Sequence, residues 1–137
     1  MSLILDSSAT LAWVFPGEKT TAIQDVFNLI AEDGAVVPEL WRIEVANVLN
    51  VSIRRRRIVL KNRTDILTEL GILPISIDGE TKTHTWNETL ALADAYNLTI
   101  YDATYLELAL RLGLPLATLD ERLRDAAERE GVLLMGK

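Results

Sequence analysis

Apolar residues recur along the chain in two patterns, and together these predict alternating strands and helices. Short apolar runs between turn residues are typical of buried strands, whereas apolar residues three or four apart mark one face of a helix. Strands are expected at Leu3–Leu5, Ala35–Val37, Leu73–Ile77, Pro115–Leu119 and Val132–Met135. Helices are expected at Ser7–Phe15, Thr20–Glu32, Glu39–Ile53, Arg63–Leu70, Thr83–Tyr96, Asp102–Leu112 and Glu121–Glu130.

Turn-forming residues support these boundaries. Pro16-Gly17 ends the first helix, Pro38 suits the first turn of the third, and Gly71 fits the C-cap of the fourth. Strands that alternate with helices imply a mostly parallel sheet covered on both faces, so the fold class is α/β. Ligands of such sheets bind beyond the carboxyl ends of the strands, near the point where the strand order reverses.

Length and composition narrow the class of protein. The 137 residues suit one domain over residues 1–137, with 49% hydrophobic and 25% charged residues. Cysteine is absent, which excludes disulfides, thiolate nucleophiles and cysteine-based metal sites. No apolar run is long enough to cross a membrane, and Met1–Ile4 lacks the pattern of a signal peptide, so a cytoplasmic location is expected.

Charge is distributed unevenly. The net charge of −6 argues against a general nucleic-acid binder, which is usually basic. Four consecutive arginines nevertheless stand near the end of the third predicted helix: Arg54, Arg55, Arg56 and Arg57. They are candidates for phosphate contacts, and the alternative is a solvated helix end where positive charge suits the helix dipole.

Four carboxylates stand in positions that invite a functional explanation. Asp6 and Asp120 each follow a predicted strand, although either could simply cap the next helix. Glu44 lies inside a helix on a partly apolar face, where it could extend to the margin and meet an arginine. Asp102 has the capping-box spacing from Thr99, but it also shares a helix face with apolar residues.

Taken together, these four acids favour a metal site. Strands of a parallel sheet end at one edge, where Asp6 and Asp120 emerge and where the helix of Glu44 begins. Clustered carboxylates without basic partners repel one another, and a divalent cation removes that repulsion. Ligands that are all oxygen favour Mg²⁺ or Mn²⁺, which activate water and neutralise charge at a phosphoryl centre.

The stretches that carry these acids resemble a known family. They are Leu3-Ile-Leu-Asp-Ser-Ser-Ala9, Pro38-Glu-Leu-Trp-Arg-Ile-Glu-Val-Ala-Asn-Val-Leu49, Leu98-Thr-Ile-Tyr-Asp-Ala-Thr-Tyr-Leu-Glu-Leu-Ala109 and Gly113-Leu-Pro-Leu-Ala-Thr-Leu-Asp-Glu-Arg-Leu123. In this order and spacing, the chain resembles the PIN-domain ribonucleases of the VapC toxin type.

That resemblance implies a three-layer α/β/α sandwich with a mainly parallel sheet of about five short strands. It implies endonucleolytic cleavage of RNA phosphodiester bonds by a water activated by Mg²⁺ or Mn²⁺. It assigns catalytic and metal-binding roles to Asp6, Glu44, Asp102 and Asp120, with Ser7 and Thr118 as supporting hydroxyls. It also implies a homodimer and a small VapB-like antitoxin, whose acidic segment is an alternative partner for the arginines.

Three other readings compete with this one. A haloacid-dehalogenase-like phosphatase requires a second aspartate two positions after Asp6, where this chain has Ser8. A receiver domain requires paired acids after the first strand, where two serines follow. A non-catalytic PIN-like binding module stays open, and metal titration separates it from an enzyme.

Overall fold

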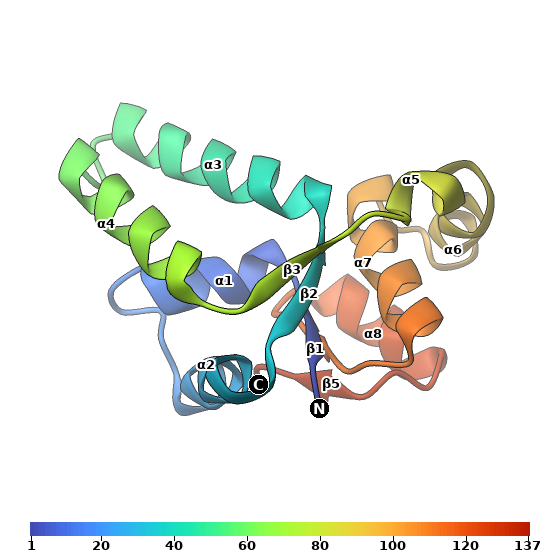
Figure 1. The fold of residues 1–137 in the computed structure, drawn as a ribbon. Coiled ribbons are helices and arrows are strands. Elements are labelled where there is room, and N and C mark those ends of the chain that lie inside the picture. Colours follow the sequence, from blue (N-terminus) through green and yellow to red (C-terminus); the bar gives the residue numbers. More distant parts are fainter.

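Apolar strands at the centre of the chain's fold form one parallel sheet between two layers of helices (Figure 1). The structure is a computed structural model that describes all of residues 1–137. Its strands are β1 (Leu3–Leu5), β2 (Ala35–Pro38), β3 (Ile75–Asp78), β4 (Leu116–Ala117) and β5 (Leu134–Met135). Their order is β3-β2-β1-β4-β5 and every pairing is parallel, which confirms the predicted fold class.

The strand order places β1 in the middle and fixes the edge where a site can form. Ile4 pairs with Val36 of β2 on one side and with Leu116 of β4 on the other. All three residues of β1 are buried, because helices cover both faces of the sheet. The order reverses between β1 and β4, so their adjacent carboxyl ends form the switch point where ligands of such folds bind.

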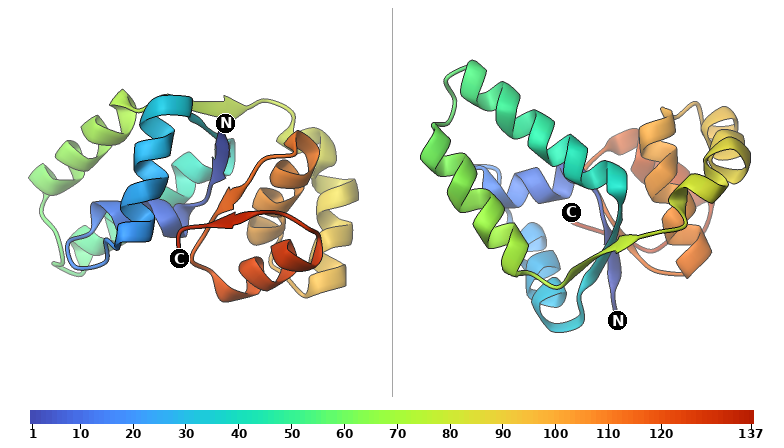
Figure 2. Two further views of the ribbon diagram at one scale, coloured as in Figure 1. Left: turned by 90° about the horizontal axis from the view of Figure 1, so that it is seen from below. Right: turned by 45° about the horizontal axis from the view of Figure 1, so that its top comes forward.

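The helices divide between the two faces of the sheet (Figures 1 and 2). The helices of one side are α1 (Ser7–Val14), α2 (Thr21–Asp33), α3 (Glu39–Arg54) and α4 (Leu60–Ile72). The other side holds α5 (Thr81–His84), a short π-helix η1 (Thr85–Thr89), α6 (Leu90–Tyr96), α7 (Ile100–Leu112) and α8 (Glu121–Arg129). The right-hand view of Figure 2 shows α3 and α7 on opposite sides of the strand ends.

Helix α4 differs most from the sequence prediction. It begins at Leu60 rather than Arg63, because the Asn62 side chain accepts a hydrogen bond from the Val59 N–H at 2.9 Å and starts the turn earlier. Gly71 lies within the helix instead of capping it. The helix ends at Ile72 because Leu73 precedes Pro74, and a residue before proline is driven out of the helical region.

Two further predictions needed correction. The expected continuous helix Thr83–Tyr96 is split by the η1 segment, although it does end at Asn97, which has a left-handed φ of 53°. The expected strand Pro115–Leu119 pairs only at Leu116 and Ala117. The chain leaves the regular strand after Ala117, although the Thr118 N–H still donates to the Met135 carbonyl of β5 at 3.3 Å.

One continuous core holds the three layers together. It comprises 29 buried hydrophobic residues drawn from the strands and from helices on both sides. The Trp41 indole N–H donates to the Thr10 hydroxyl at 2.9 Å, which ties α3 to α1 without leaving the buried nitrogen unpaired.

No helix of this chain has the length and apolar character needed to traverse a bilayer.

Candidate active site

Asp6 and Asp120 end adjacent strands and cap the helices that follow them. Asp6 accepts a hydrogen bond from the Ala9 N–H at 2.9 Å at the start of α1. Asp120 accepts one from the Leu123 N–H at 2.9 Å at the start of α8. Each carboxylate therefore does cap a helix, as the sequence suggested, and capping also holds both carboxylates at the switch-point edge.

Asp6 is the most enclosed of the four acids. Its side chain is buried with 3% of the residue exposed, and it accepts hydrogen bonds from the Ser8 hydroxyl at 2.7 and 2.9 Å. The Thr118 hydroxyl donates to its other face at 2.5 Å. Burial raises the pKa of Asp6 to about 6, even though Ala9, Thr118 and Ser8 each lower it. The fold therefore keeps a carboxylate in a place that disfavours its charge.

Glu44 owes its position inside α3 to a tyrosine. The Tyr105 hydroxyl donates to Glu44 Oε1 at 2.5 Å, from a side chain that is only 1% exposed. The sequence suggested an arginine as an alternative partner of Glu44, and no arginine pairs with it. Burial and the hydrogen bond to Glu44 both raise the pKa of Tyr105, so the hydroxyl stays protonated and acts as a donor.

Asp102 lies in the first turn of α7, and its field reaches the other acids. Its N–H donates to the Thr99 hydroxyl at 3.1 Å, which is one half of the predicted capping box. Burial, together with the charges of Asp120 and Glu44, raises the pKa of Asp102 to about 6. Asp102 in turn raises the pKa of Asp6. We call Asp6, Glu44, Asp102 and Asp120 the acidic edge.

No basic side chain neutralises the acidic edge. All six ion pairs of the chain involve other acids: Asp33, Asp65, Glu88, Asp78, Glu107 and Glu121. No three acidic or histidine side chains are grouped closely enough to hold a metal ion together in this arrangement. Mg²⁺ commonly uses one or two carboxylates and fills its remaining positions with water, so the donor set still suits such an ion.

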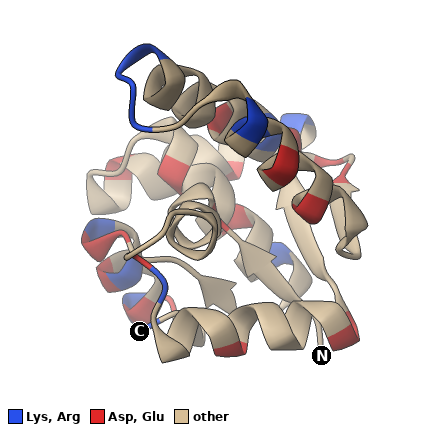
Figure 3. Cartoon of the chain, turned by 90° about the vertical axis from the view of Figure 1, so that its left-hand side faces the viewer, with Lys and Arg blue, Asp and Glu red and all other residues tan.

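The arginine run lies at the far end of α3. Arg54 is the last residue of the helix, and Arg55, Arg56 and Arg57 follow in an exposed loop (Figure 3). The Arg57 guanidinium stands 5.5 Å from the centre of the Phe15 ring. Arg57 also lines a groove of about 430 Å³ whose wall includes Ser8 and Leu119. This groove joins one arginine of the four to the neighbourhood of Asp6.

Two candidate supporting residues, Ser8 and Tyr105, were not predicted from the sequence. Ser8 holds Asp6 and also accepts the Leu119 N–H at 2.9 Å, whereas Ser7 lies near the Tyr105 hydroxyl and lowers its pKa. Tyr105 is not among the site residues that the resemblance implies. The spacing of Asp102 and Tyr105 already placed them on one helix face, but their meeting with Glu44 depends on how α3 packs near α7.

Known proteins match this chain over almost its whole length. The sequence profile of the PIN domain family matches residues 3–129. Ribonuclease VapC3 of Pyrobaculum aerophilum is 29% identical over 125 residues, which cover 91% of this chain and 94% of that protein. Almost the full length of the two chains therefore corresponds.

Solved structures share the fold. The crystal structure of PAE2754 from Pyrobaculum aerophilum matches with a TM-score of 0.70 and 25% identity, over 98% of this chain and 92% of that one. The Mycobacterium tuberculosis toxin VapC20, which cleaves the sarcin-ricin loop, matches with a TM-score of 0.62 and 16% identity, over 90% and 94%. The predicted resemblance is confirmed, and the chain belongs to the PIN domain family.

Proposed function

We propose that this PIN-domain protein is an endoribonuclease that depends on Mg²⁺ or Mn²⁺ and hydrolyses RNA phosphodiester bonds. The observation that carries the proposal is the acidic edge: four carboxylates that are coupled through their charges and have no basic partner. Such an arrangement disfavours its own charge, and the pKa of both Asp6 and Asp102 rises to about 6. A bound divalent cation would offset that unfavourable charge.

The four acids would hold the cation, with Asp6 and Asp102 the most direct ligands. When bound, a divalent cation supplies charge neutralisation at a phosphoryl oxygen and a water of lowered pKa. The chain's own contribution is orientation. Ser8, Thr118 and the Ala9 N–H fix the Asp6 carboxylate, and Tyr105 fixes that of Glu44. Fixed ligands avoid the cost of reorganising during the reaction.

Substrate RNA would reach the acidic edge along the groove that Arg57 lines. Ser8 lines the same groove and hydrogen-bonds Asp6, and Arg57 presents an exposed cation. A strand whose scissile phosphate lies at the acids would then place another phosphate near Arg57. Substitution of Arg54 to Arg57 by glutamine should reduce the salt dependence of RNA binding, and an unchanged slope would remove these arginines from the RNA path.

The relatives suggest a biological setting. Ribonuclease VapC3 and the toxin VapC20 carry names of one toxin type, so we propose that this chain acts as the toxin of a VapBC-type pair in the cytoplasm. Its partners would be a VapB-like antitoxin and a second copy of itself. A short neighbouring reading frame for a DNA-binding protein that co-purifies with this chain and inhibits it would establish that setting.

The decisive experiment compares the wild type with Asp6→Asn on a long single-stranded RNA, with and without Mg²⁺. We expect cleavage by the wild type only with Mg²⁺, and a loss of at least about 100-fold in the variant, as is typical when one group that stabilises transition-state charge is removed. Asp94→Asn, at an exposed position of α6, serves as the purification control for contaminating nuclease. Metal-dependent cleavage by Asp6→Asn at the wild-type rate would refute the assignment.

A non-catalytic binding module is the second candidate. It is favoured by the finding that no three acidic side chains are grouped to hold a metal together. Calorimetric titration of the wild type with Mg²⁺ and Mn²⁺ separates the two functions. Binding of neither ion would favour the module, whereas the enzyme requires at least one of them to bind.

A further inference from the structure

Tyr105 carries an inference that rests on the proposed function and deepens it. We propose that its hydroxyl is the positioning group of Glu44, which fixes one oxygen of that carboxylate and leaves the other to face a cation. Tyr105 itself touches neither metal nor RNA in this proposal. It acts on the acidic edge through Glu44 alone.

The surroundings of the two side chains support this role. Tyr105 lies in the middle of α7 and is 1% exposed, so its ring is held by the core on all sides. Glu44 is half-buried within α3, with no ion pair, and the Tyr105 hydroxyl is its one side-chain hydrogen-bond partner. A rigid aromatic ring therefore fixes a flexible carboxylate, because tyrosine has two side-chain torsions and its packing allows neither to change.

The direction of the hydrogen bond matters as much as its presence. The phenol is the donor and Glu44 Oε1 is the acceptor, at 2.5 Å, so the bond favours the ionised carboxylate. Without this donor, Glu44 would face the negative field of Asp102 with no protein hydrogen bond to hold it. Removal of the hydroxyl should leave the fold intact and free Glu44 to turn away from the acidic edge.

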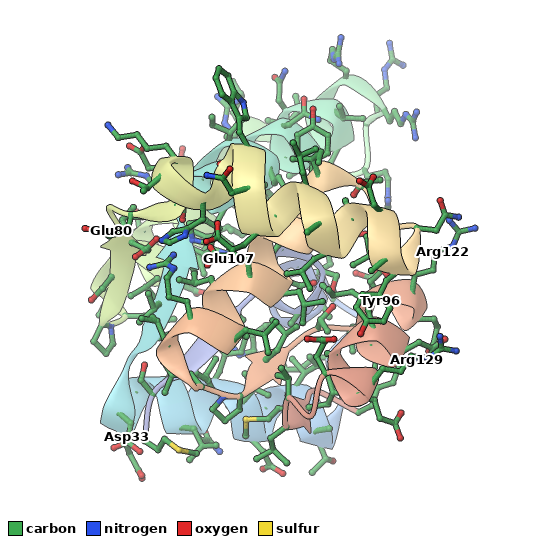
Figure 4. The ribbon with its side chains drawn as sticks, turned by 90° about the vertical axis from the view of Figure 1, so that its right-hand side faces the viewer. Asp33, Glu80, Tyr96, Glu107, Arg122 and Arg129 are labelled. Atoms are coloured by element: carbon green, nitrogen blue, oxygen red, sulfur yellow. The ribbon has the colours of Figure 1, made fainter.

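Tyr96 offers a matched control. Its hydroxyl also hydrogen-bonds a glutamate, Glu130, but this pair joins the end of α6 to the end of α8 on the outer surface (Figure 4). Tyr96→Phe therefore removes the same kind of tyrosine–carboxylate bond at a place that does not touch the acidic edge.

The test measures Mn²⁺ binding by calorimetry for the wild type, Tyr105→Phe, Tyr96→Phe and Glu44→Gln, with melting temperatures recorded in EDTA. We expect Tyr105→Phe to weaken Mn²⁺ binding by about 10-fold, the lower end of the effect of losing a group that orients a metal ligand. Tyr96→Phe should bind as the wild type does. In the Glu44→Gln background, Tyr105→Phe should cause no further loss, because the tyrosine acts only through that carboxylate.

Each outcome is decisive. Wild-type affinity in Tyr105→Phe, alongside weakened binding in Glu44→Gln, would overturn the role of Tyr105 and leave the proposed function standing. An equal additional loss in the Glu44→Gln background would also overturn it, since the tyrosine would then act by another route. A wild type that binds neither Mn²⁺ nor Mg²⁺ would overturn both proposals.

Discussion

Two groups of carboxylates in this chain differ in whether a cation of the chain lies beside them. In the acidic edge, Asp6 and Asp102 have no cation beside them, and the pKa of each rises to about 6. At the other end of α7, Arg111 donates to Glu107 at 2.7 Å and to Asp78 at 2.8 Å. There the arginine lowers the pKa of Asp78, and we call these three residues the Arg111 network.

The difference lies in where the compensating charge comes from. Glu107 is as buried as Asp6, with 3% of the residue exposed, and Figure 4 shows it on α7 beneath the α5–α6 segment. Its cation, Arg111, is covalently part of the chain, so the charge of Glu107 is compensated without any ion from solution. The acidic edge has no such cation within the chain, and under the proposed function a divalent ion from solution would take that place.

The largest effect should come from removing the internal cation. Arg111→Met leaves Asp78 and Glu107 without a partner, and breaking a buried pair from one side typically costs about 3–5 kcal/mol of folding free energy. Urea unfolding at neutral pH measures this loss, with Arg122→Met at an exposed position as the control. A loss no greater than that of the control would show that the Arg111 network is not the structural counterpart of the acidic edge.

A smaller effect should come from supplying the missing cation. Mg²⁺ at about 10 mM should stabilise the wild type by about 1.4 kcal/mol if its dissociation constant is near 1 mM. Thermal melts at neutral pH and matched ionic strength measure the shift. Asp6→Asn should show little of it, and Arg111→Met should show all of it, because the proposed ion binds at the acidic edge and not at the Arg111 network. Equal shifts in wild type and Asp6→Asn would mean that the ion binds elsewhere.

The smallest effect on stability should come from neutralising one carboxylate of the acidic edge in the absence of metal. The pKa of Asp102 in the folded chain, about 6, lies above the ordinary value of 3.8 for the free side chain, so the folded state binds the proton more tightly. Stability contributed by this group is therefore present below pH 4 and is lost as the pH rises to 6 and beyond. Asp102→Asn should accordingly melt higher than the wild type in EDTA at pH 8.

The gain from Asp102→Asn should be about 1 kcal/mol at pH 8, since the side chain is partly exposed and solvent screens its charge. It should disappear below pH 4, where the wild-type carboxyl is protonated in both states. Asp94→Asn on the exposed face of α6 should change nothing at either pH. A variant that melts lower than the wild type at pH 8 would contradict the raised pKa.

Much of the fold could be predicted because the determining signals are local. Strand and helix order, the left-handed Asn97 and the cap at Gly113 follow from apolar periodicity and turn residues. Errors arose where neighbours outside the local pattern decided the outcome. Asn62 extended α4, Pro74 ended it, and pairing with only two partner residues on each side shortened β4.

The sequence by itself determined which residue types were available: four carboxylates in strand-end and helix positions, and an arginine run on another segment. It could not assign their partners, because the neighbours of a carboxylate in the folded chain decide whether it caps a helix, forms an ion pair or binds a ligand. The placement of α3 and α7 on either side of the strand ends brought the Tyr105 hydroxyl to Glu44. The parallel register of β1 and β4 brought Thr118 to Asp6. Burial and the nearby charge of Asp102, which raise the pKa of Asp6, exist only once the layers have closed.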